Sequence, residues 1–456
     1  MITPNKADAN PTKAFFVRMI TRDISLEDCI LDLIDNSIDG AWKMEGGQPM
    51  SLDGDENLKG YNIEITISED TFTISDNCGG ITLDDAATYA FTFGRKDEDA
   101  HERYSIGVYG IGMKRAVFKI GKMIEIKSTY KNRGAMIESF KIPINVDNWL
   151  STDPKKSWDL DIEATDDLAA PGVSIVISSL NEPTASSFSD PGFIQRLKRV
   201  IERDYTLHLR RGLSIAINGE PLNGWTIELQ SGKNFAPMRI SYSEASESGN
   251  VLVEIIAGMA APPPEDTEPE EGGEQQRTPQ RSGWYVACNG RLVVAADQST
   301  LTGWGTEGWP KWHPQYDGFL GLILFTSENA ELLPITTTKR SIDTSSAVFR
   351  HAAPKMREVS KSWISYTNIR KQNLEEARKT EADARPTPIH SVPIRQKVAL
   401  PSLTPKPKIP VANIAYSMPR SRVTELANSM GDINLSYKEV GIKSFEHAYS
   451  DFVGDD

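Results

Sequence analysis

The residues best suited to chemistry lie in one short stretch, Ser25–Trp42, with the sequence SLEDCILDLIDNSIDGAW. If this stretch is a helix, Asp32, Asn36 and Asp39 fall within about 60° of one another around its axis. Apolar residues gather on the opposite face: Leu26, Ile30, Leu33, Ile34 and Ala41. The pattern predicts a helix that packs with one face and binds with the other. A solvated face of a surface helix has the same composition and is the alternative.

Two glycine-containing stretches follow, Ile74–Ile81 (ISDNCGGI) and Gly107–Lys114 (GVYGIGMK). Glycine permits positive φ and close backbone approach, and free amides at the start of a helix attract phosphate. The second stretch precedes a predicted helix near Lys114, so it suits a phosphate-binding loop; a mobile surface loop is the alternative. The sequence contains no GxxxxGK[ST] motif, which disfavours a P-loop fold.

The elements that must position these residues are visible in the pattern as well. Ser25 can cap the first turn of the helix, with Asp28 three residues further on. Tyr61–Asp76 alternates apolar and polar residues around a Glu69-Asp70 turn. This alternation predicts a hairpin that places Asp76 at the end of a strand, where a binding residue is expected.

In this order the three motifs resemble those of the GHKL ATPases. That family includes type II topoisomerase ATPase subunits, heat-shock chaperones of the ninety-kilodalton class, sensor kinases, MutL and MORC. The resemblance covers roughly residues 13–370 and is tightest over 25–121. It implies an α+β chain in which an N-terminal GHKL (Bergerat) α/β sandwich is followed by a transducer-like α/β domain. It also implies an enzyme that uses Mg²⁺ and hydrolyses ATP to ADP and phosphate.

The resemblance assigns roles to the helix residues. In the family, a glutamate four residues before the helix asparagine polarises water, and the asparagine binds Mg²⁺. Asn36 matches the asparagine, and Asp32 stands where the glutamate is expected. Aspartate is one methylene shorter, which is compatible with slow hydrolysis, and a capping or supporting role for Asp32 is the alternative. Asp39 matches the last aspartate of the motif, as a residue of the nucleotide site or as a structural one.

Adenine and phosphate contacts are implied in the same way. Asp76 matches the aspartate that accepts a hydrogen bond from the adenine amino group, where guanine has a carbonyl. Cys78 replaces the first glycine of the family pattern, whereas Gly80 is retained. The family's later Gly-Thr pair is Gly172-Val173 here, so Ser174 is the candidate hydroxyl. The other predicted nucleotide contacts are Ile81, Gly107, Gly110, Ile111, Gly112, Met113 and Lys114. The resemblance also implies that residues 93–113 form a nucleotide lid that closes over the γ-phosphate.

Four segments are expected along the chain. They are a GHKL ATP-binding domain (1–183), a transducer-like domain (184–372) with an acidic disordered insertion (260–281), a Pro-rich basic linker (373–412) and a small helical C-terminal module (413–456). In related proteins a transducer loop brings a lysine to the γ-phosphate. Lys339 is the candidate, with Arg340 as its alternate, and a solvated basic pair is the other interpretation.

Composition narrows the partners and the compartment. The net charge of −13 argues against a surface that is basic throughout, as general nucleic-acid binding would require. A local basic contact remains open, because Ala384–Thr424 holds seven basic residues and no acidic one. Three scattered cysteines suggest neither disulfides nor zinc. Without an apolar run of membrane length or a signal peptide, a cytoplasmic protein with no membrane contact is expected.

Two functions from different classes are consistent with these features. The first is an ATPase whose nucleotide state closes a homodimer, most like the MORC, MutL and topoisomerase branch, acting on DNA or a DNA-associated complex. Antiviral defence is attached to bacterial MORC-like proteins by family association only. The second is an ATP-gated protein clamp or chaperone-like module with no nucleic-acid contact. A histidine kinase is the weakest option, because no phosphoacceptor-histidine helix precedes the ATP-binding motifs.

Overall fold

The computed structural model describes residues 11–47, 50–53, 56–92, 103–107, 110–151, 158–264, 282–403 and 412–454. Most of the predicted acidic insertion and of the predicted nucleotide lid lies outside these residues. The chain divides into two compact units, Met1–Pro405 and Lys406–Asp456. Both helices and sheets build the first unit, which confirms the α+β prediction.

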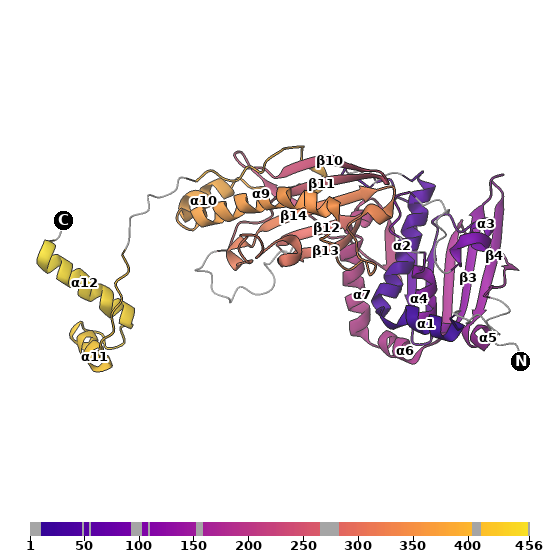
Figure 1. Cartoon of the computed structure of the whole chain (residues 1–456), viewed down its shortest axis with the longest axis horizontal. Coiled ribbons are helices and arrows are strands. Elements are labelled where there is room, and N and C mark those ends of the chain that lie inside the picture. Colours follow the sequence, from indigo (N-terminus) through magenta and orange to yellow (C-terminus); the bar gives the residue numbers. More distant parts are fainter. Residues whose placement is uncertain are drawn as a thin grey trace, which may run out of the picture. The chain divides into compact units, whose positions relative to one another are not determined.

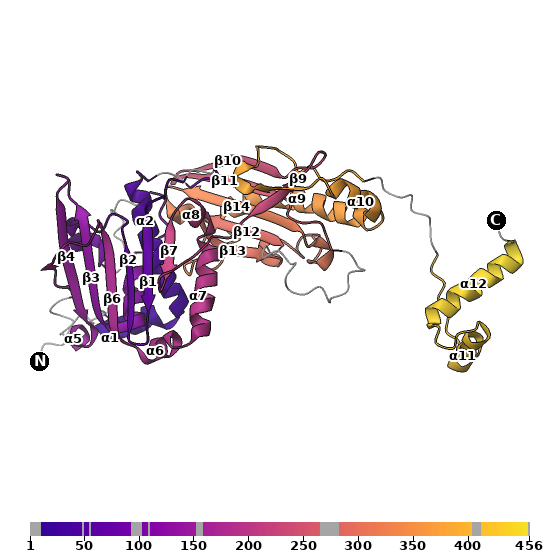
Figure 2. The ribbon, with the colours of Figure 1, turned by 180° about the vertical axis from the view of Figure 1, so that it is seen from behind.

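The described residues of the first unit contain an eight-stranded sheet in the order β5-β4-β3-β6-β2-β1-β7-β8. Its strands are β1 (Asn62–Ile67), β2 (Thr71–Asp76), β3 (Gly121–Lys131), β4 (Ile137–Asn145), β5 (Glu163–Ala164), β6 (Gly172–Leu180), β7 (Ser214–Ile217) and β8 (Glu220–Pro221). The antiparallel β1–β2 pair confirms the predicted hairpin, with Asp76 at the end of β2. Figure 2 shows the open face of this sheet.

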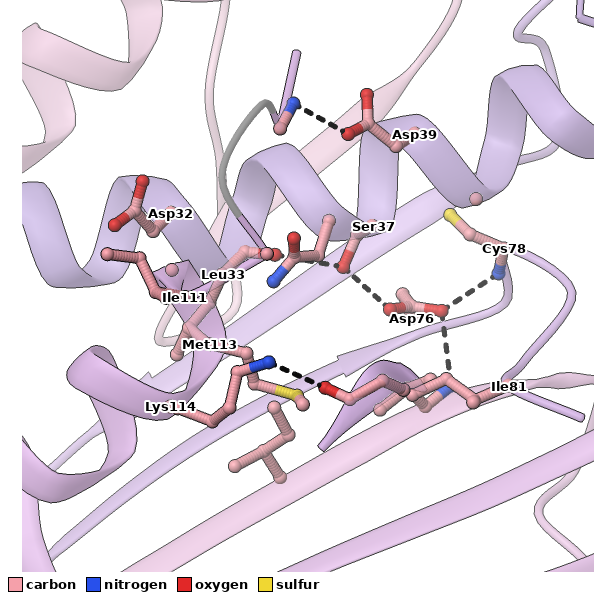
Figure 3. Close-up of a pocket in the computed structure, with 18 of the residues that line it drawn as sticks. Asp32, Leu33, Ser37, Asp39, Asp76, Cys78, Ile81, Ile111, Met113 and Lys114 are labelled. Atoms are coloured by element: carbon pink, nitrogen blue, oxygen red, sulfur yellow. Dashed lines mark hydrogen bonds between the residues drawn. The ribbon is translucent and has the colours of Figure 1, made fainter. Parts of the chain in front are cut away.

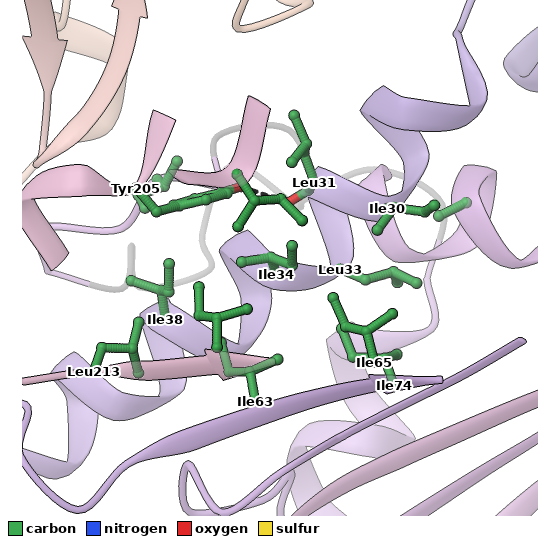
Figure 4. Close-up of a cluster of buried hydrophobic side chains, with 14 of the residues drawn as sticks. Ile30, Leu31, Leu33, Ile34, Ile38, Ile63, Ile65, Ile74, Tyr205 and Leu213 are labelled. Carbon is green, nitrogen blue, oxygen red and sulfur yellow. Dashed lines mark hydrogen bonds between the residues drawn. The ribbon is translucent and has the colours of Figure 1, made fainter. Parts of the chain in front are cut away.

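Helices cover the other face of the first sheet (Figure 1). They include α1 (Lys13–Arg22), α2 (Leu26–Met44), α4 (Gly112–Ile120), α7 (Pro191–Asp204) and α8 (Thr206–Arg210). Ser25 caps α2 by accepting a hydrogen bond from the Asp28 amide, as predicted. Apolar side chains of α2, among them Ile34 and Ile38, pack over Ile63, Ile65 and Ile74 of the hairpin (Figure 4). The helix that carries the candidate chemistry therefore lies in the centre of the core.

A second sheet has the order β10-β11-β14-β12-β13. Its strands are β10 (Met238–Ser246), β11 (Gly249–Met259), β12 (Gly283–Cys288), β13 (Arg291–Asp297) and β14 (Phe319–Ser327). Alternate residues of β14 join different cores. Leu322 and Leu324 belong to the core of the first sheet, whereas Ile323 and Phe325 belong to a core formed with helix α9 (Ala347–Arg370). Because the two sheets share a core, they form one compact unit.

The chain differs from two expected boundaries. Strand β7 pairs in parallel with β1, so the first sheet continues beyond residue 183. The described part of the segment expected as a linker contains regular structure: α10 (Leu374–Glu381) and β15 (Arg385–Pro388), which pairs with β9 (Glu228–Ser231). Ile389 and Val392 are buried after it. Proline suits an edge strand as well as a linker, because both leave its missing N–H without consequence.

The second unit contains α11 (Arg420–Ser429) and α12 (Tyr437–Val453) in its described residues. Ser436 and Glu439 form a capping box at the start of α12. Across the described parts of both units, no helix combines the length and the apolarity that crossing a bilayer requires.

Candidate functional site

A cavity of about 360 Å³ lies beside α2, between the end of β2, strand β6, a π-helix at Ala86–Ala90 and the start of α4 (Figure 3). Its lining brings together most of the residues that the sequence proposed: Asp32, Asn36, Asp39, Asp76, Gly80, Ile81, Gly107, Gly110, Ile111, Gly112, Met113, Lys114 and Lys339. Lys339 comes from the loop between β14 and α9, about three hundred residues after α2. Residues distant in sequence therefore share one concave surface.

Ser174 is not part of this lining. Its neighbours Val173 and Ile175 face the cavity instead. Side chains alternate along a strand, so the Ser174 hydroxyl points to the other side of β6. The proposed replacement of the family's threonine hydroxyl is therefore wrong for this structure.

Asp76 is held by three hydrogen bonds at one end of the cavity. Its Oδ1 accepts from the amides of Cys78 (2.9 Å) and Val173 (3.2 Å), and its Oδ2 accepts from the Ser37 hydroxyl (2.6 Å). Burial raises the pKa of Asp76 above its ordinary value, although the three donors oppose that rise. An ionised carboxylate has about four acceptor positions, so one position on Oδ2 remains for a further donor.

Apolar side chains line the cavity together with that carboxylate: Ile74, Cys78, Ile81, Met113, Val173 and Ile175. The Cys78 thiol contributes apolar surface, because burial, reinforced by Asp76, raises its pKa. Gly80 has φ +75°, and a Cβ there would lie 2.1 Å from the Thr129 carbonyl oxygen. The retained glycine is thus required by the backbone. We refer to Asp76 and these apolar side chains together as the base end of the cavity.

The middle of the cavity is formed by the polar face of α2. Within the described run from Cys29 to Asp39, Asn36 is the only exposed residue. Asp39 accepts hydrogen bonds from the amides of Ile106 (2.7 Å) and Gly107 (3.0 Å), so it holds the start of the glycine-rich loop. This contact gives Asp39 a loop-positioning role in this structure.

Helix α4 begins directly at the cavity. Its N-cap residue, Ile111, makes no side-chain hydrogen bond to the first turn, and the positive end of the helix dipole there favours an anion. A Cβ on Gly112 would lie 3.2 Å from Asp32 Cγ, which shows how closely α4 approaches α2. Lys114 donates to the carbonyls of Ala90 (2.9 Å) and Thr92 (2.6 Å) and so fixes the segment after the π-helix.

Asp32 is paired with two cations. Arg115 Nε donates to Asp32 Oδ2 at 2.7 Å, and Lys339 Nζ donates to Oδ1 at 3.1 Å. Asp32 is 3 % exposed, so these are buried ion pairs. The sequence reasoning missed Arg115; its only signal was a second basic residue directly after Lys114. We refer to Asp32, Arg115, Lys339 and the start of α4 as the phosphate end.

Lys339 also binds Asp35, on a side of α2 that sequence periodicity did not single out. The Lys339 Nζ to Asp35 Oδ2 distance is 2.6 Å, and Asp35 further accepts from Tyr205 Oη (2.7 Å) and pairs with Arg291. Burial would lower the pKa of Lys339, but Asp35 and Asp32 outweigh it, and the pKa is raised. Burial would raise the pKa of Asp35, but Arg291 and Lys339 hold it below its ordinary value.

The alternate residue, Arg340, has a different set of partners. It pairs with Asp28 in the first turn of α2 and with Asp204 at the end of α7, where the distance is 3.2 Å. It does not line the cavity. Other lining residues that the sequence did not identify are Leu33, Gly40, Lys43, Asp85, Tyr89, Ala90 and Thr337. Several of these lie in or beside the π-helix, an irregularity that periodicity cannot reveal.

Comparison with known proteins supports a narrow conclusion. Residues 24–164 match the family described as histidine kinase-, DNA gyrase B- and HSP90-like ATPase. The match covers less than a third of the 456 residues and ends before β6 and the second sheet. A search of curated proteins gave no match. Residues 24–164 are therefore a GHKL ATPase domain of the histidine kinase, gyrase B and HSP90 type.

Proposed function

We propose that the cavity binds ATP together with Mg²⁺ and that the chain hydrolyses it to ADP and phosphate. The observation that carries this proposal is the convergence of four features in one cavity. They are the free acceptor position on Asp76, the exposed Asn36 amide, the start of α4 and Lys339 from the loop between β14 and α9. Adenine would place its amino group against Asp76 Oδ2, and the apolar side chains of the base end would enclose the ring.

The middle of the cavity fits a magnesium ion that is bound mainly through phosphates. Mg²⁺ prefers oxygen ligands, keeps several waters and takes one or two protein ligands at nucleotide sites. Asn36 is exposed to the cavity and would supply such an oxygen. When bound there, the ion neutralises phosphate charge. Asp39 is already engaged with two loop amides, so its part would be to hold the loop around the phosphates.

The phosphate end offers excess positive charge. Asp32 in this end and Asp35 beside it face three cations, Arg115, Lys339 and Arg291. Asp35 and Arg291 lie outside the cavity lining. A terminal phosphate would compete with Asp32 for Arg115 and Lys339. Asp32 released in this way can accept a proton from an attacking water and act as the general base. Because that base is occupied beforehand, slow basal hydrolysis is expected.

The decisive experiment is calorimetric titration of the full chain with ATP and Mg²⁺. We expect wild type to bind and Asn36→Ala to lose binding, since triphosphate charge then lacks its metal ligand. Asn434→Ala, at an exposed asparagine of the second unit, is the control and should bind as wild type does. Unchanged affinity in Asn36→Ala would refute the assignment of the site.

For the cellular action, we propose nucleotide-driven closure of a homodimer on DNA or on a DNA-associated complex, as in the MORC-like branch. Related GHKL domains commonly dimerise, which supports the proposed closure of a homodimer. Light scattering with and without a non-hydrolysable ATP analogue tests it, and an unchanged mass would count against closure.

The proposed action on DNA has an alternative, in which the chain is an ATP-gated protein clamp without nucleic-acid contact. In the basic segment proposed to touch DNA, the backbone of Arg395 forms a bridge with Arg239, while the Arg395 side chain is exposed. Phosphate contacts would make duplex affinity fall steeply between about 50 and 200 mM salt. Anisotropy that shows no salt-dependent binding would favour the protein clamp.

A further inference from the structure

The turn between β12 and β13 is buried, whereas most hairpin turns lie at the surface. Asn289 and Gly290 form its tip, with φ angles of +44° and +86°, as in two-residue hairpin turns. Asn289 and Arg291 are each 1 % exposed. Neither residue lines the proposed nucleotide cavity. The turn belongs to the second sheet, yet its side chains contact elements that form the cavity.

Asn289 contacts the end of the predicted lid. Its Nδ2 donates to the Ser105 carbonyl (2.8 Å) and to the Ser327 carbonyl (3.2 Å), and its Oδ1 accepts from the Ser327 amide (3.0 Å). The next two residues after Ser105 donate their amides to Asp39 of α2. One side-chain amide therefore links the second sheet to the segment from which the glycine-rich loop continues.

A neighbouring contact strengthens the same link. The Tyr104 amide donates to the Glu328 carbonyl (3.2 Å), and Tyr104 Oη donates to Glu328 Oε1 (3.3 Å). Glu328 directly follows β14, the strand beside β12. The segment 103–107 is thus fixed to the second sheet on one side and to α2 on the other.

Arg291, at the other end of the turn, contacts α2 itself. It pairs with Asp35 and lies over the Tyr205 ring, 5.6 Å from its centre. Tyr205 Oη donates to Asp35 (2.7 Å). Asp35 immediately precedes Asn36, whose side chain faces the cavity. Any rotation or shift of α2 at Asn36 therefore acts directly on the partner of Arg291.

Gly290 leaves no room between these two contacts. A Cβ there would lie 2.5 Å from Met50 Cε and 2.8 Å from His208 Cε1. The tip of the turn therefore has little free space around it. Because the tip is enclosed, we expect a movement of the lid end or of α2 to shift β12 and β13 or to break one of the buried bonds.

We infer that the β12–β13 turn is a second coupling element, in which Asn289 and Arg291 are positioning residues that tie the second sheet to the lid end and to α2. This inference rests on the proposed ATP binding and extends it. It differs from the role of Lys339, which lines the cavity, because the turn would respond to nucleotide without contacting it. Two separate contacts let the second sheet respond to both the lid and the helix.

The test uses Asn289→Asp in the full chain. Aspartate tolerates the positive φ of this position but replaces a donor with an acceptor that faces two carbonyls. Asn218→Asp is a matched control: Asn218 also precedes glycine in a hairpin turn, has φ +52° and bonds the adjacent strand at Ile67. It lies at the β7–β8 turn, outside the cavity lining. Asn289→Gly removes the amide without adding charge and serves if Asn289→Asp does not fold.

Two measurements are made with a non-hydrolysable ATP analogue and with ATP. In wild type and Asn218→Asp, hydrogen exchange over 283–297 should slow when the analogue binds. In the Asn289 variants this response should disappear. We expect kcat to fall by at least about fivefold, the low end of usual coupling, because the lost coupling acts on the transition state. KM for ATP should stay within about twofold, because the nucleotide contacts are intact. A merely structural role would lower stability without removing the exchange response selectively.

The outcomes are separable. If calorimetry shows that wild type does not bind the analogue, the proposed function fails and this inference fails with it. If wild type binds the analogue but exchange over 283–297 is unchanged, ATP binding stands and the coupling role is refuted. Retention of the full exchange response in both Asn289 variants refutes it equally.

Discussion

The two ends of the cavity are built in different ways. At the base end, Asp76 is held by Ser37 and by two backbone amides, all within the first sheet and α2. At the phosphate end, Asp32 is held by Arg115 of α4 and by Lys339 from the loop that follows the second sheet. The base end is thus complete within the first sheet and α2, whereas the phosphate end also requires the loop that follows the second sheet.

This difference predicts that the base end selects the nucleotide base and that the phosphate end responds to the bound phosphates. Neutral donors at the base end fix one carboxylate geometry, which suits selection of a base. Ion pairs at the phosphate end can be exchanged for a phosphate, since Arg and Lys bind carboxylate and phosphate oxygens alike. A nucleotide would therefore change few contacts at the base end and several at the phosphate end. Changes at the phosphate end should affect turnover more strongly than affinity.

The largest expected effect is on turnover at the phosphate end. Asp32→Ala should keep ATP binding, because Arg115 and Lys339 remain available to the phosphate, and lower kcat by about 10²–10⁴-fold through loss of the base. Calorimetry and phosphate release measure the two quantities separately. If binding and turnover are lost together, Asp32 is structural and another group activates water.

Lys339→Ala is the next test of the same end. Asp32 and Asp35 would each keep one cation, Arg115 and Arg291, so folding should survive. Hydrolysis should slow by about 10²-fold, as for loss of one preorganised charge in a site, with ATP binding weakened only modestly.

Arg340→Ala provides the adjacent control, since its partners Asp28 and Asp204 lie outside the cavity lining. It should have the milder effect on phosphate release. An inactive Arg340→Ala beside a normal Lys339→Ala would reverse the two assignments and remove Lys339 from the proposed sensor role.

The base end is tested by selectivity. Asp76→Asn should weaken ATP binding by about 10–100-fold, the value of a hydrogen bond to a charged group, and should reduce discrimination against GTP. Asp85→Asn carries the same substitution at another lining residue and should bind ATP normally. Competition titrations of ATP and GTP measure both effects. Equal losses in the two variants would mean that the base does not lie at Asp76.

The smallest expected effect lies at the junction of the sheets and concerns stability. Burial, reinforced by Arg211 and Arg291 against the opposing effect of Asp35, lowers the pKa of His208 to about 3. The unfolded chain therefore binds this proton more readily. Stability is fully present above the ordinary histidine pKa of about 6.5 and falls as the pH drops toward 3, by about 2 kcal/mol between pH 7 and 5.

His208→Phe should flatten that dependence, as measured by urea unfolding at the two pH values. His447→Phe, at an exposed site in the second unit, is the control. The Asp35 contribution lies below this window, because its pKa is lowered and its stabilisation is lost only in more acidic solution. An unchanged slope in His208→Phe would show that His208 is not the titrating group.

Local patterns in the sequence predicted the parts of the site that lie on regular elements. Periodicity located α2, alternation located the β1–β2 hairpin with Asp76 at its end, and glycine spacing located the loop before α4. These features depend on neighbours a few residues apart, so a single chain reveals them. The resemblance to the GHKL family gave the order of these motifs a functional interpretation. It also made Lys339 the candidate lysine for the γ-phosphate.

The contacts that join the two sheets could be identified only from the tertiary structure. Asp35 lies on a face of α2 that binds Arg291 and Lys339, residues more than two hundred and fifty positions away, and no local pattern marks such a partner. Arg115 and the orientation of Ser174 depend on how α4 and β6 pack. The proline-rich stretch after α9 has the composition of a linker, but it pairs with β9 and buries Ile389 and Val392. Composition indicates the conformations that a segment prefers in isolation. Whether the segment is buried depends on the surfaces that pack against it.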